Sequence, residues 1–363
     1  RRRPPGLQAL QGPGHREGLT AGAVDGASEH GGDVFAERRA KLEAWRATGA
    51  AYPTSYQPRD EIGPLRAAYE GLAAGEDSGE VHRVAGRLMA RRVHGKVSFL
   101  VVKDMSGELQ LFAQVDALGA ERYEALGHLD LGDHVGAEGT VMRTRRGELS
   151  LRVTSWQLLT KSLRPLPEKF HGLTDVELRY RKRYLDTAVN DESREVFIKR
   201  ARIIRTIRDF LDERGFVEVE TPILQPLYGG AMARPFVTHH NELKRDLYLR
   251  IAPELYLKRC IIGGIDRVYE IGKDFRNEGV SYKHNPEFTM LETYEAYVDY
   301  THVMTMVEEM LVAAANAVGS LKVEFRGHEI DLTPPWPRLT MREAICEKTG
   351  IDIGADDART VAD

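Results

Sequence analysis

Hydrophobic and polar positions alternate on both sides of a polar loop in residues 268–294. Before the loop, one face of the alternation holds Tyr269, Ile271 and Phe275. After the loop, one face holds Phe288, Met290, Glu292 and Tyr294. The residues between, 277–287, contain the glycine, asparagine and proline that favour loops. A period of two is typical of β-strands, so the pattern predicts a strand, a loop and a second strand.

The N-terminal part of the chain is predicted to be a helical segment followed by a small barrel. Residues 1–33 are rich in Gly, Ala and Arg without periodicity, which predicts a disordered tail. A first helix is expected to begin at Asp33 as its capping residue, and a second covers residues 64–72. Between residues 81 and 160, five short segments with strand alternation are separated by glycine-containing turns. These favour an OB-fold barrel, which binds oligonucleotides on one face.

Beyond residue 163 the pattern predicts helices mixed with strands. Asp191 is placed to cap a helix that ends at Gly215, and a strand follows over residues 216–222. A further amphipathic helix is expected over residues 303–318, followed by a strand pair and a short helix. We therefore expect an α+β protein with a five-stranded barrel and a larger domain. The expected domains are a tail, a helical segment, the barrel and an α+β domain, at residues 1–33, 34–78, 79–162 and 163–363.

Composition narrows the class of protein. The 363 residues are 42% hydrophobic and 29% charged, as in globular proteins. A formal net charge of −4 argues against polyanion binding by the whole surface and leaves local basic patches open. Two cysteines, Cys260 and Cys346, are too few for a disulfide framework and suit a cytoplasmic protein. No apolar run in the sequence is long enough to span a bilayer, and no membrane partner is expected.

Three side chains of the central stretch carry chemistry that a plain sheet does not need. Arg276 has the planar guanidinium that makes two parallel bonds to a phosphate, and Phe288 can stack on a base. Glu292 falls on a largely apolar face, where an unpaired carboxylate is costly. Its cationic partner is either an arginine or lysine of the chain, in an internal salt bridge, or the amine of a ligand. The residues alone leave both interpretations open.

The strings FRNEG and HNPEFTMLE, which span both predicted strands and the loop, resemble motif 2 of the class II aminoacyl-tRNA synthetases. The second string resembles the lysine enzyme in particular. The resemblance implies a class II catalytic domain with an antiparallel sheet flanked by helices. It also implies activation of lysine with ATP and Mg²⁺ to lysyl-adenylate, and transfer of lysine to tRNA(Lys). The helix, strand and proline before residue 223 resemble motif 1, which implies a homodimer.

The resemblance also implies roles for the matching residues of the catalytic domain. The ATP-binding set is Arg276, Glu278, Lys283, His284, Asn285 and Phe288, and Arg276 is the catalytic residue that draws charge from the α-phosphate. The lysine-binding set is Gly230, Glu254, Glu292 and Tyr294. Within it, Glu254 binds the α-ammonium group, while Glu292 and Tyr294 hold the side chain. Lys283 stands where many bacterial members carry arginine, and we expect a modest effect on ATP binding.

The barrel segment continues the resemblance. The strings GRLMARRVHGKVSF, GELQLF and GELSL resemble the anticodon-binding domain of bacterial lysyl-tRNA synthetases. The resemblance assigns base stacking to Phe99 and hydrogen bonding to Gln110 and Glu148. A surface of this kind can read unstacked anticodon bases, since A-form duplex hides its base edges.

The sequence departs from the family in its last part. We find no G-x-G-x-x-R pattern of the kind that carries motif 3, and the acidic Mg²⁺ ligands of the family also belong to that part. The resemblance therefore implies a chain truncated before motif 3, with a partial catalytic domain and no metal ligands of its own. A noncatalytic tRNA-binding or regulatory relative without a complete active site is the alternative. An enzyme that lysylates a protein is a third possibility, against which the barrel argues.

Overall fold

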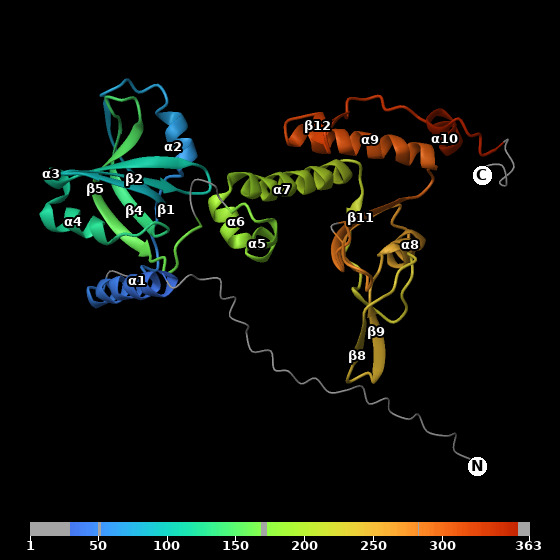
Figure 1. Ribbon diagram of the computed structural model, residues 1–363. Helices are drawn as coiled ribbons and strands as arrows, with labels where there is room; N and C mark the ends of the chain where they lie inside the picture. Colours follow the sequence, from blue (N-terminus) through green and yellow to red (C-terminus); the bar gives the residue numbers. More distant parts are fainter. Residues whose placement is uncertain (1–29, 50–51, 168–172, 282, 355–363) are drawn as a thin grey trace, which may run out of the picture. The chain divides into compact units, whose positions relative to one another are not determined.

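The computed structural model describes residues 30–49, 52–167, 173–281 and 283–354, with the backbone alone for residues 30–32 (Figure 1). The chain divides between Val189 and Asn190 into two compact units. The predicted tail lies outside the described residues except at its end, where a helix already begins. The boundaries expected from the sequence for the four domains stay predictions.

Unit 1 is built on a closed barrel, as predicted, with strand order β1-β2-β3-β5-β4. Its strands are β1 (Asp77–His94), β2 (Val97–Lys103), β3 (Glu108–Gln114), β4 (His134–Arg143) and β5 (Leu149–Thr160). β3 pairs with β5 in parallel, and the other neighbours are antiparallel. Alternate apolar residues of every strand, among them Leu88, Leu100, Leu111 and Leu151, form the core. The barrel's outer face therefore carries the residues in between.

Unit 1 also contains helices of different lengths. They are α1 (His30–Ala47), α2 (Ile62–Ala68), α3 (Val115–Leu118), α4 (Ala120–Ala125), η1 (Leu126–His128), α5 (Val176–Arg181) and α6 (Arg183–Val189). The prediction that Asp33 caps the first helix was wrong, because α1 begins at His30 and Asp33 lies in its first turn. The second helix begins and ends earlier than predicted, because the buried Ile62 anchors it to the barrel core and its amide donates to Asp104.

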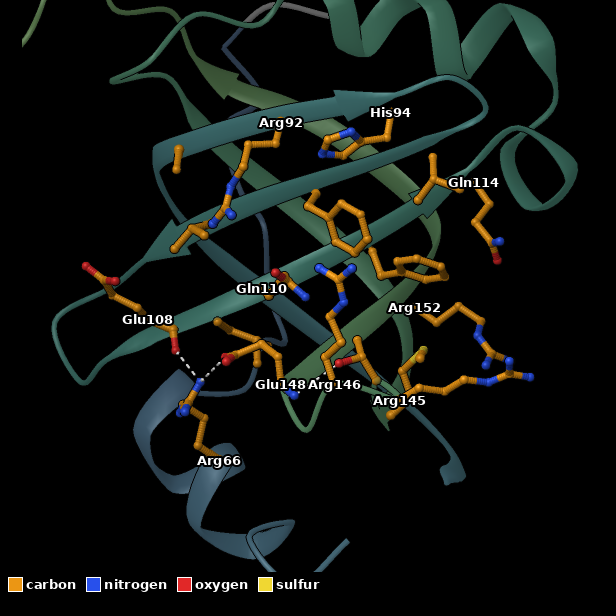
Figure 2. Close-up of a pocket in the computed structure, with 18 residues that line it drawn as sticks. Arg66, Arg92, His94, Glu108, Gln110, Gln114, Arg145, Arg146, Glu148 and Arg152 are labelled. Carbon is orange, nitrogen blue, oxygen red and sulfur yellow. Dashed lines mark hydrogen bonds and ion pairs between the residues drawn. The ribbon is translucent and has the colours of Figure 1, made fainter. Parts of the chain in front are cut away.

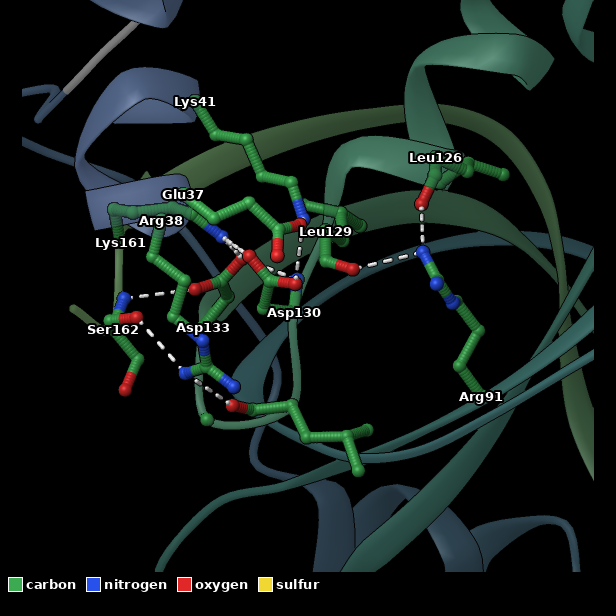
Figure 3. A network of polar contacts seen from close by, with 12 residues as sticks. Glu37, Arg38, Lys41, Arg91, Leu126, Leu129, Asp130, Asp133, Lys161 and Ser162 are labelled. Atoms are coloured by element: carbon green, nitrogen blue, oxygen red, sulfur yellow. Dashed lines mark hydrogen bonds and ion pairs between the residues drawn. The ribbon is translucent and has the colours of Figure 1, made fainter. Parts of the chain in front are cut away.

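A polar cluster fastens α1 and the segment after β5 to the barrel (Figure 3). The Asp133 carboxylate is fully buried and accepts bonds from Lys161 Nζ at 2.7 Å and from the Ser162 amide at 2.8 Å. From α1, Arg38 donates to the carbonyls of Leu131 at 3.2 Å and Ser162 at 3.0 Å. Because the side chains of Lys161 and Asp133 at its centre are fully buried, the cluster is a fixed part of the unit and not a mobile surface network.

Unit 2 contains a three-stranded sheet of order β11-β10-β6, flanked by helices. Its strands are β6 (Val217–Glu218), β10 (Arg267–Phe275) and β11 (Glu287–Glu295), and its long helices are α7 (Asp191–Asp212) and α9 (Tyr300–Ala317). The predicted antiparallel strand–loop–strand is confirmed, and β10 and β11 pair from Arg267↔Glu295 to Phe275↔Glu287. α7 packs on α9 over a core with the buried Tyr269.

The remaining elements of unit 2 complete the picture. They are β7 (Leu224–Gln225), β8 (Val237–His240), β9 (Arg245–Leu249), α8 (Glu254–Ile262), β12 (Lys322–Phe325), β13 (His328–Asp331) and α10 (Met341–Thr349). Asp191 proved to be the first residue of α7 and not its cap, which is Asn190. The helix predicted from residue 303 begins at Tyr300, because the Asp299 carboxylate accepts from the amides of Thr301 and His302. Within the described part of the chain, none of the helices has the length and apolarity that a membrane span requires.

Candidate functional site

One face of the β10–β11 pair carries the polar residues that form the candidate site of unit 2. Residues directly opposite in an antiparallel pair point to the same face. The register sets Asp274 opposite Phe288, Gly272 opposite Met290, Glu270 opposite Glu292 and Val268 opposite Tyr294. One face therefore holds three carboxylates, a tyrosine and a phenylalanine.

A buried arginine lies across this face. Arg250 follows β9 and is 1% exposed. Its guanidinium donates to Glu270 Oε1 at 2.5 Å, to Thr221 Oγ1 at 3.0 Å and to the Lys273 carbonyl at 2.9 Å. A Cβ at Gly272 would lie 2.0 Å from Arg250 Nη2, so glycine is required for the guanidinium to reach its partners. The arginine neutralises one carboxylate charge and leaves an excess of negative charge on this face.

Asp274 is the least satisfied group of the site. It is fully buried, and among the described residues neither of its oxygens receives a hydrogen bond. Arg250 Nε lies 3.1 Å from Oδ1 but donates to the Lys273 carbonyl instead. Burial raises the pKa of Asp274 to about 6, against the lowering effect of Arg250 and Arg276. The carboxyl is therefore poised between its charged and neutral forms near neutral pH.

The sequence left open whether Glu292 pairs with a cation of the chain or with the amine of a ligand. Within the described ranges, Glu292 forms no ion pair with an arginine, lysine or histidine, and its one hydrogen bond comes from the Tyr294 hydroxyl at 3.2 Å. Burial raises the pKa of Glu292, and the negative charges of Asp274 and Glu254 raise it further. Burial and the Glu292 charge likewise raise the pKa of Tyr294, so its hydroxyl stays protonated and can donate. A carboxylate in these surroundings is suited to a cationic ligand.

Gly230 and Glu254 meet beside these carboxylates. Gly230 has a positive φ of 86°, and a Cβ there would lie 2.8 Å from Glu254 Cβ. Glu254 is in the first turn of α8, where the helix dipole favours a carboxylate. Its Oε1 lies 2.5 Å from Lys258 Nζ one turn along the helix. Because Lys258 is mostly exposed, a ligand ammonium group can replace it at Glu254.

Arg276 and Phe288 lie together at the end of the strand pair. The Arg276 guanidinium carbon is 5.0 Å from the centroid of the Phe288 ring, and Nη2 donates to the Ile251 carbonyl at 3.5 Å. Arg276 Nε is buried and has no hydrogen-bond partner among the described residues. An arginine held beside an aromatic ring, with a donor to spare, is equipped to bind a phosphate next to a stacked base.

Two loops border this end of the site. Glu278 Oε1 accepts from the Arg234 amide at 3.2 Å, and the Asn277 amide donates to the Arg234 carbonyl at 2.8 Å. Residues of both loops line an open cavity of about 660 Å³. His284 Nδ1 lies 2.8 Å from Ser281 Oγ. The other two predicted loop residues, Lys283 and Asn285, are exposed.

The barrel of unit 1 carries a second candidate site. A broad cavity of about 1420 Å³ opens on its outer face, and the three predicted anticodon residues Phe99, Gln110 and Glu148 all line it. Gln110 donates to Ser150 Oγ at 2.9 Å, and Glu148 lies 3.7 Å from the Arg66 guanidinium. Figure 2 shows Arg92 and His94 on one side of this cavity and Arg145, Arg146 and Glu148 on the other, with Gln110 between them.

Comparison with known proteins matches both units to families. Residues 82–159 match the OB-fold nucleic acid binding domain, and residues 175–362 match the class II tRNA synthetases of the D, K and N group. The chain belongs to the class II aminoacyl-tRNA synthetases. The recognition made from the FRNEG and HNPEFTMLE strings is thereby confirmed.

Individual relatives narrow the family to the lysine–tRNA ligases. The lysine–tRNA ligase of Moorella thermoacetica is 52% identical over 336 residues, which are 91% of this chain and 68% of the relative. That of Pelotomaculum thermopropionicum is 56% identical over 273 residues, or 75% of this chain and 54% of the relative. The lysine–tRNA ligase of Nitrosomonas europaea is 51% identical over 330 residues, which are 90% of this chain and 66% of the relative. The chain thus spans between about half and two thirds of the length of these relatives.

The fold brings most of the residues predicted for the catalytic domain into two groups. Glu254, Glu292 and Tyr294 are coupled by charge, and Gly230 touches Glu254. Arg276 and Phe288 form the second group. The individual roles stay predictions.

Sequence reasoning missed Arg250, Glu270 and Asp274 as parts of the site. Arg250 stands in the otherwise apolar string YLRIAP, which was the available signal. Among the described residues, no cluster of three or more His, Cys, Asp or Glu could hold a metal ion. The described residues therefore assign no Mg²⁺ site.

Proposed function

We propose that this chain provides the lysine-activating and anticodon-binding parts of a lysine–tRNA ligase. The reaction joins lysine to ATP as lysyl-adenylate, with release of pyrophosphate, and then transfers lysine to tRNA(Lys). The observation that carries the proposal is Glu292, a half-buried carboxylate with a raised pKa and a tyrosine as its hydrogen-bond donor. A lysine ε-ammonium group supplies the ion-pair partner that Glu292 does not have among the described residues.

The amino acid is held at both ends in this proposal. Glu292 and the Tyr294 hydroxyl bind the ε-ammonium group, and the negative charge of Asp274 strengthens the negative potential around it. Glu254 binds the α-ammonium group after Lys258 moves away. Gly230 leaves the space in which that group sits, since any side chain would meet Glu254. The site rejects uncharged analogues because a buried carboxylate would be left without a partner.

Phosphate chemistry then follows from positioning and charge. The lysine carboxylate oxygen attacks the α-phosphorus of ATP, and the bond from that phosphorus to the pyrophosphate oxygen breaks. Arg276 binds the α-phosphate and stabilises the negative charge that develops there. Phe288 stacks on the adenine, with the Arg276 guanidinium already 5.0 Å from its ring. Lys283 neutralises the outer phosphates, while Glu278, His284 and Asn285 shape the loop around the nucleotide.

Assembly and location follow the same proposal. Apolar side chains are exposed on α7 and β6, including Val196 at 62%, Phe197 at 53% and Val217 at 48%. Exposed apolar residues concentrated on adjacent elements favour an interface, and we propose a second copy of the chain as the partner, in a homodimer. Charging of tRNA would place the protein in the cytoplasm.

The test is amino-acid-dependent ATP–pyrophosphate exchange by the chain, run with all twenty amino acids and with norleucine, which lacks the ε-ammonium group. Exchange with lysine alone supports the proposal. Exchange with norleucine would contradict the role of Glu292. Folded protein that binds tRNA(Lys) and gives no exchange would mean that the chain is either a fragment without a complete active site or the noncatalytic relative. The protein-lysylating alternative is disfavoured by the nucleic-acid-binding barrel.

A further inference from the structure

Four side chains form a straight row across the outer face of the barrel. The strand register sets Arg92 of β1 opposite Phe99 of β2, Phe99 opposite Phe112 of β3, and Phe112 opposite Arg152 of β5. All four line the open cavity of unit 1. The row therefore reads arginine, phenylalanine, phenylalanine, arginine over four consecutive strands of the sheet.

The two aromatic rings of this row face outward and not into the core. Their chain neighbours Leu100 and Leu111 are buried in the barrel at 1% and 2% exposure. Because side chains alternate along a strand, Phe99 and Phe112 point to the opposite face, where both are partly exposed. Two adjacent outward phenylalanines that line an open cavity do not serve the core, which is complete behind them.

The geometry of the rings suits two bases instead of one. Their centroids are 5.4 Å apart and their planes are inclined by 48°, so each ring keeps a face of its own. Neighbouring strands of a sheet are about 4.8 Å apart, so the second ring lies one strand further along the cavity. Aromatic rings spaced in this way are how sheets stack successive bases of a single strand.

The arginines give the row its electrostatic character. Arg152 is held in place because its Nη1 lies 2.9 Å from Asp77 Oδ2. Arg145 and Arg146, between β4 and β5, are exposed and line the same cavity. Guanidinium groups at both ends of an aromatic row attract the phosphates that link stacked bases.

We propose that Phe112 is a second base-stacking residue, so that the barrel stacks two consecutive unpaired bases, one on Phe99 and the next on Phe112. Arg152 closes the far end of the row and contacts the phosphate beyond the second base. The proposal rests on the proposed function, which makes a tRNA anticodon loop the ligand.

The experiment measures binding of the full chain to an RNA hairpin with the anticodon loop of tRNA(Lys), at one fixed salt concentration. Three further hairpins each lack one anticodon base. Phe112→Ala should weaken binding of the intact hairpin roughly fivefold to a hundredfold. The base stacked on Phe112 is then identified by a double-mutant cycle. Removal of that base from the hairpin should weaken binding to the wild-type chain and should not weaken binding to the Phe112→Ala variant any further.

Matched variants separate stacking from packing. Phe112→Trp keeps an aromatic face and should bind the hairpin as tightly as the wild type. Phe112→Leu keeps an apolar side chain against Phe99 and should bind as weakly as Phe112→Ala, with an unchanged melting temperature. Tight binding by Phe112→Leu, or additive effects in every cycle, would overturn the proposal.

The same experiment distinguishes this inference from the proposed function. If Phe99→Ala loses affinity while Phe112→Ala binds normally, the barrel binds the anticodon but Phe112 does not stack, and only the inference fails. If the wild-type chain does not distinguish the hairpin from one with a scrambled loop, the anticodon-binding function itself fails, and the role of Phe112 with it.

Discussion

Replacing Asp274 with asparagine should stabilise unit 2 at neutral and alkaline pH and have no effect in acid. The carboxyl is fully buried without a hydrogen bond from the described residues, and burial raises its pKa from the ordinary 3.8 to about 6. The folded state therefore binds the proton more tightly than the unfolded state does. Between about pH 4 and pH 6 the folding stability falls as the pH rises, because the buried group must then ionise.

The size of the effect follows from the two pKa values. Each tenfold difference in proton affinity corresponds to about 1.4 kcal/mol, so the change from 3.8 to about 6 destabilises the wild-type fold by about 3 kcal/mol above pH 6. Asparagine has nearly the same shape and no charge. The gain from Asp274→Asn should therefore approach about 3 kcal/mol at pH 8 and vanish near pH 4.

The assay is urea unfolding at pH 4, 6 and 8, with hydrogen-exchange mass spectrometry of β10 and β11 peptides so that unit 2 alone is followed. The matched control is Asp246→Asn, which removes the same charge from an exposed site of the same unit. Its effect should stay within about 0.5 kcal/mol at every pH. An Asp274→Asn gain that is equal at pH 4 and pH 8, or absent at both, would refute the reasoning.

Three other changes test other parts of the structure. Gly272→Ala should lower the free energy of unfolding in urea by about 3–5 kcal/mol, because the new Cβ displaces the buried Arg250 guanidinium from its carboxylates. An unchanged free energy of unfolding would show that the arginine has another position available. Glu292→Gln should weaken lysine binding on the order of a hundredfold in calorimetry while ATP binding changes little, and equal losses for both ligands would remove Glu292 from the lysine pocket. Arg38→Met should lower the stability of unit 1 by about 1–3 kcal/mol, because partly buried carbonyls lose their donor, whereas the exposed Arg39→Met should not. Equal effects of the two substitutions would show that the cluster contributes nothing specific.

Local patterns in the sequence were enough to predict the elements around both sites. The alternation from Val268 to Tyr294 predicted the β10–β11 pair, and five alternating segments predicted the barrel. Helix starts were less well predicted, as the positions of Asp33 and Asp191 show. A residue that can cap a helix does not by itself fix the position at which the helix begins, because packing can place the first turn a few residues earlier or later.

Site composition depended on contacts that no local pattern contains. Nothing in the string YLRIAP says that Arg250 crosses onto the face of β10, 20 residues away along the chain from Glu270. Nothing near Phe112 in sequence says that it lies between Phe99 and Arg152. Such neighbours are set by strand register and by packing of segments that are distant in sequence.

By itself, then, the sequence determined the periodic elements, the family and the candidate residues, because strand and helix patterns and motif strings are local properties of the chain. Only the tertiary structure decided that, among the described residues, Glu292 has no internal cation and the buried Asp274 receives no hydrogen bond, and that two phenylalanines stand side by side on the barrel. The physical reason is that burial and partnership are properties of the folded neighbourhood, where a charge is desolvated or paired only after distant segments have packed around it.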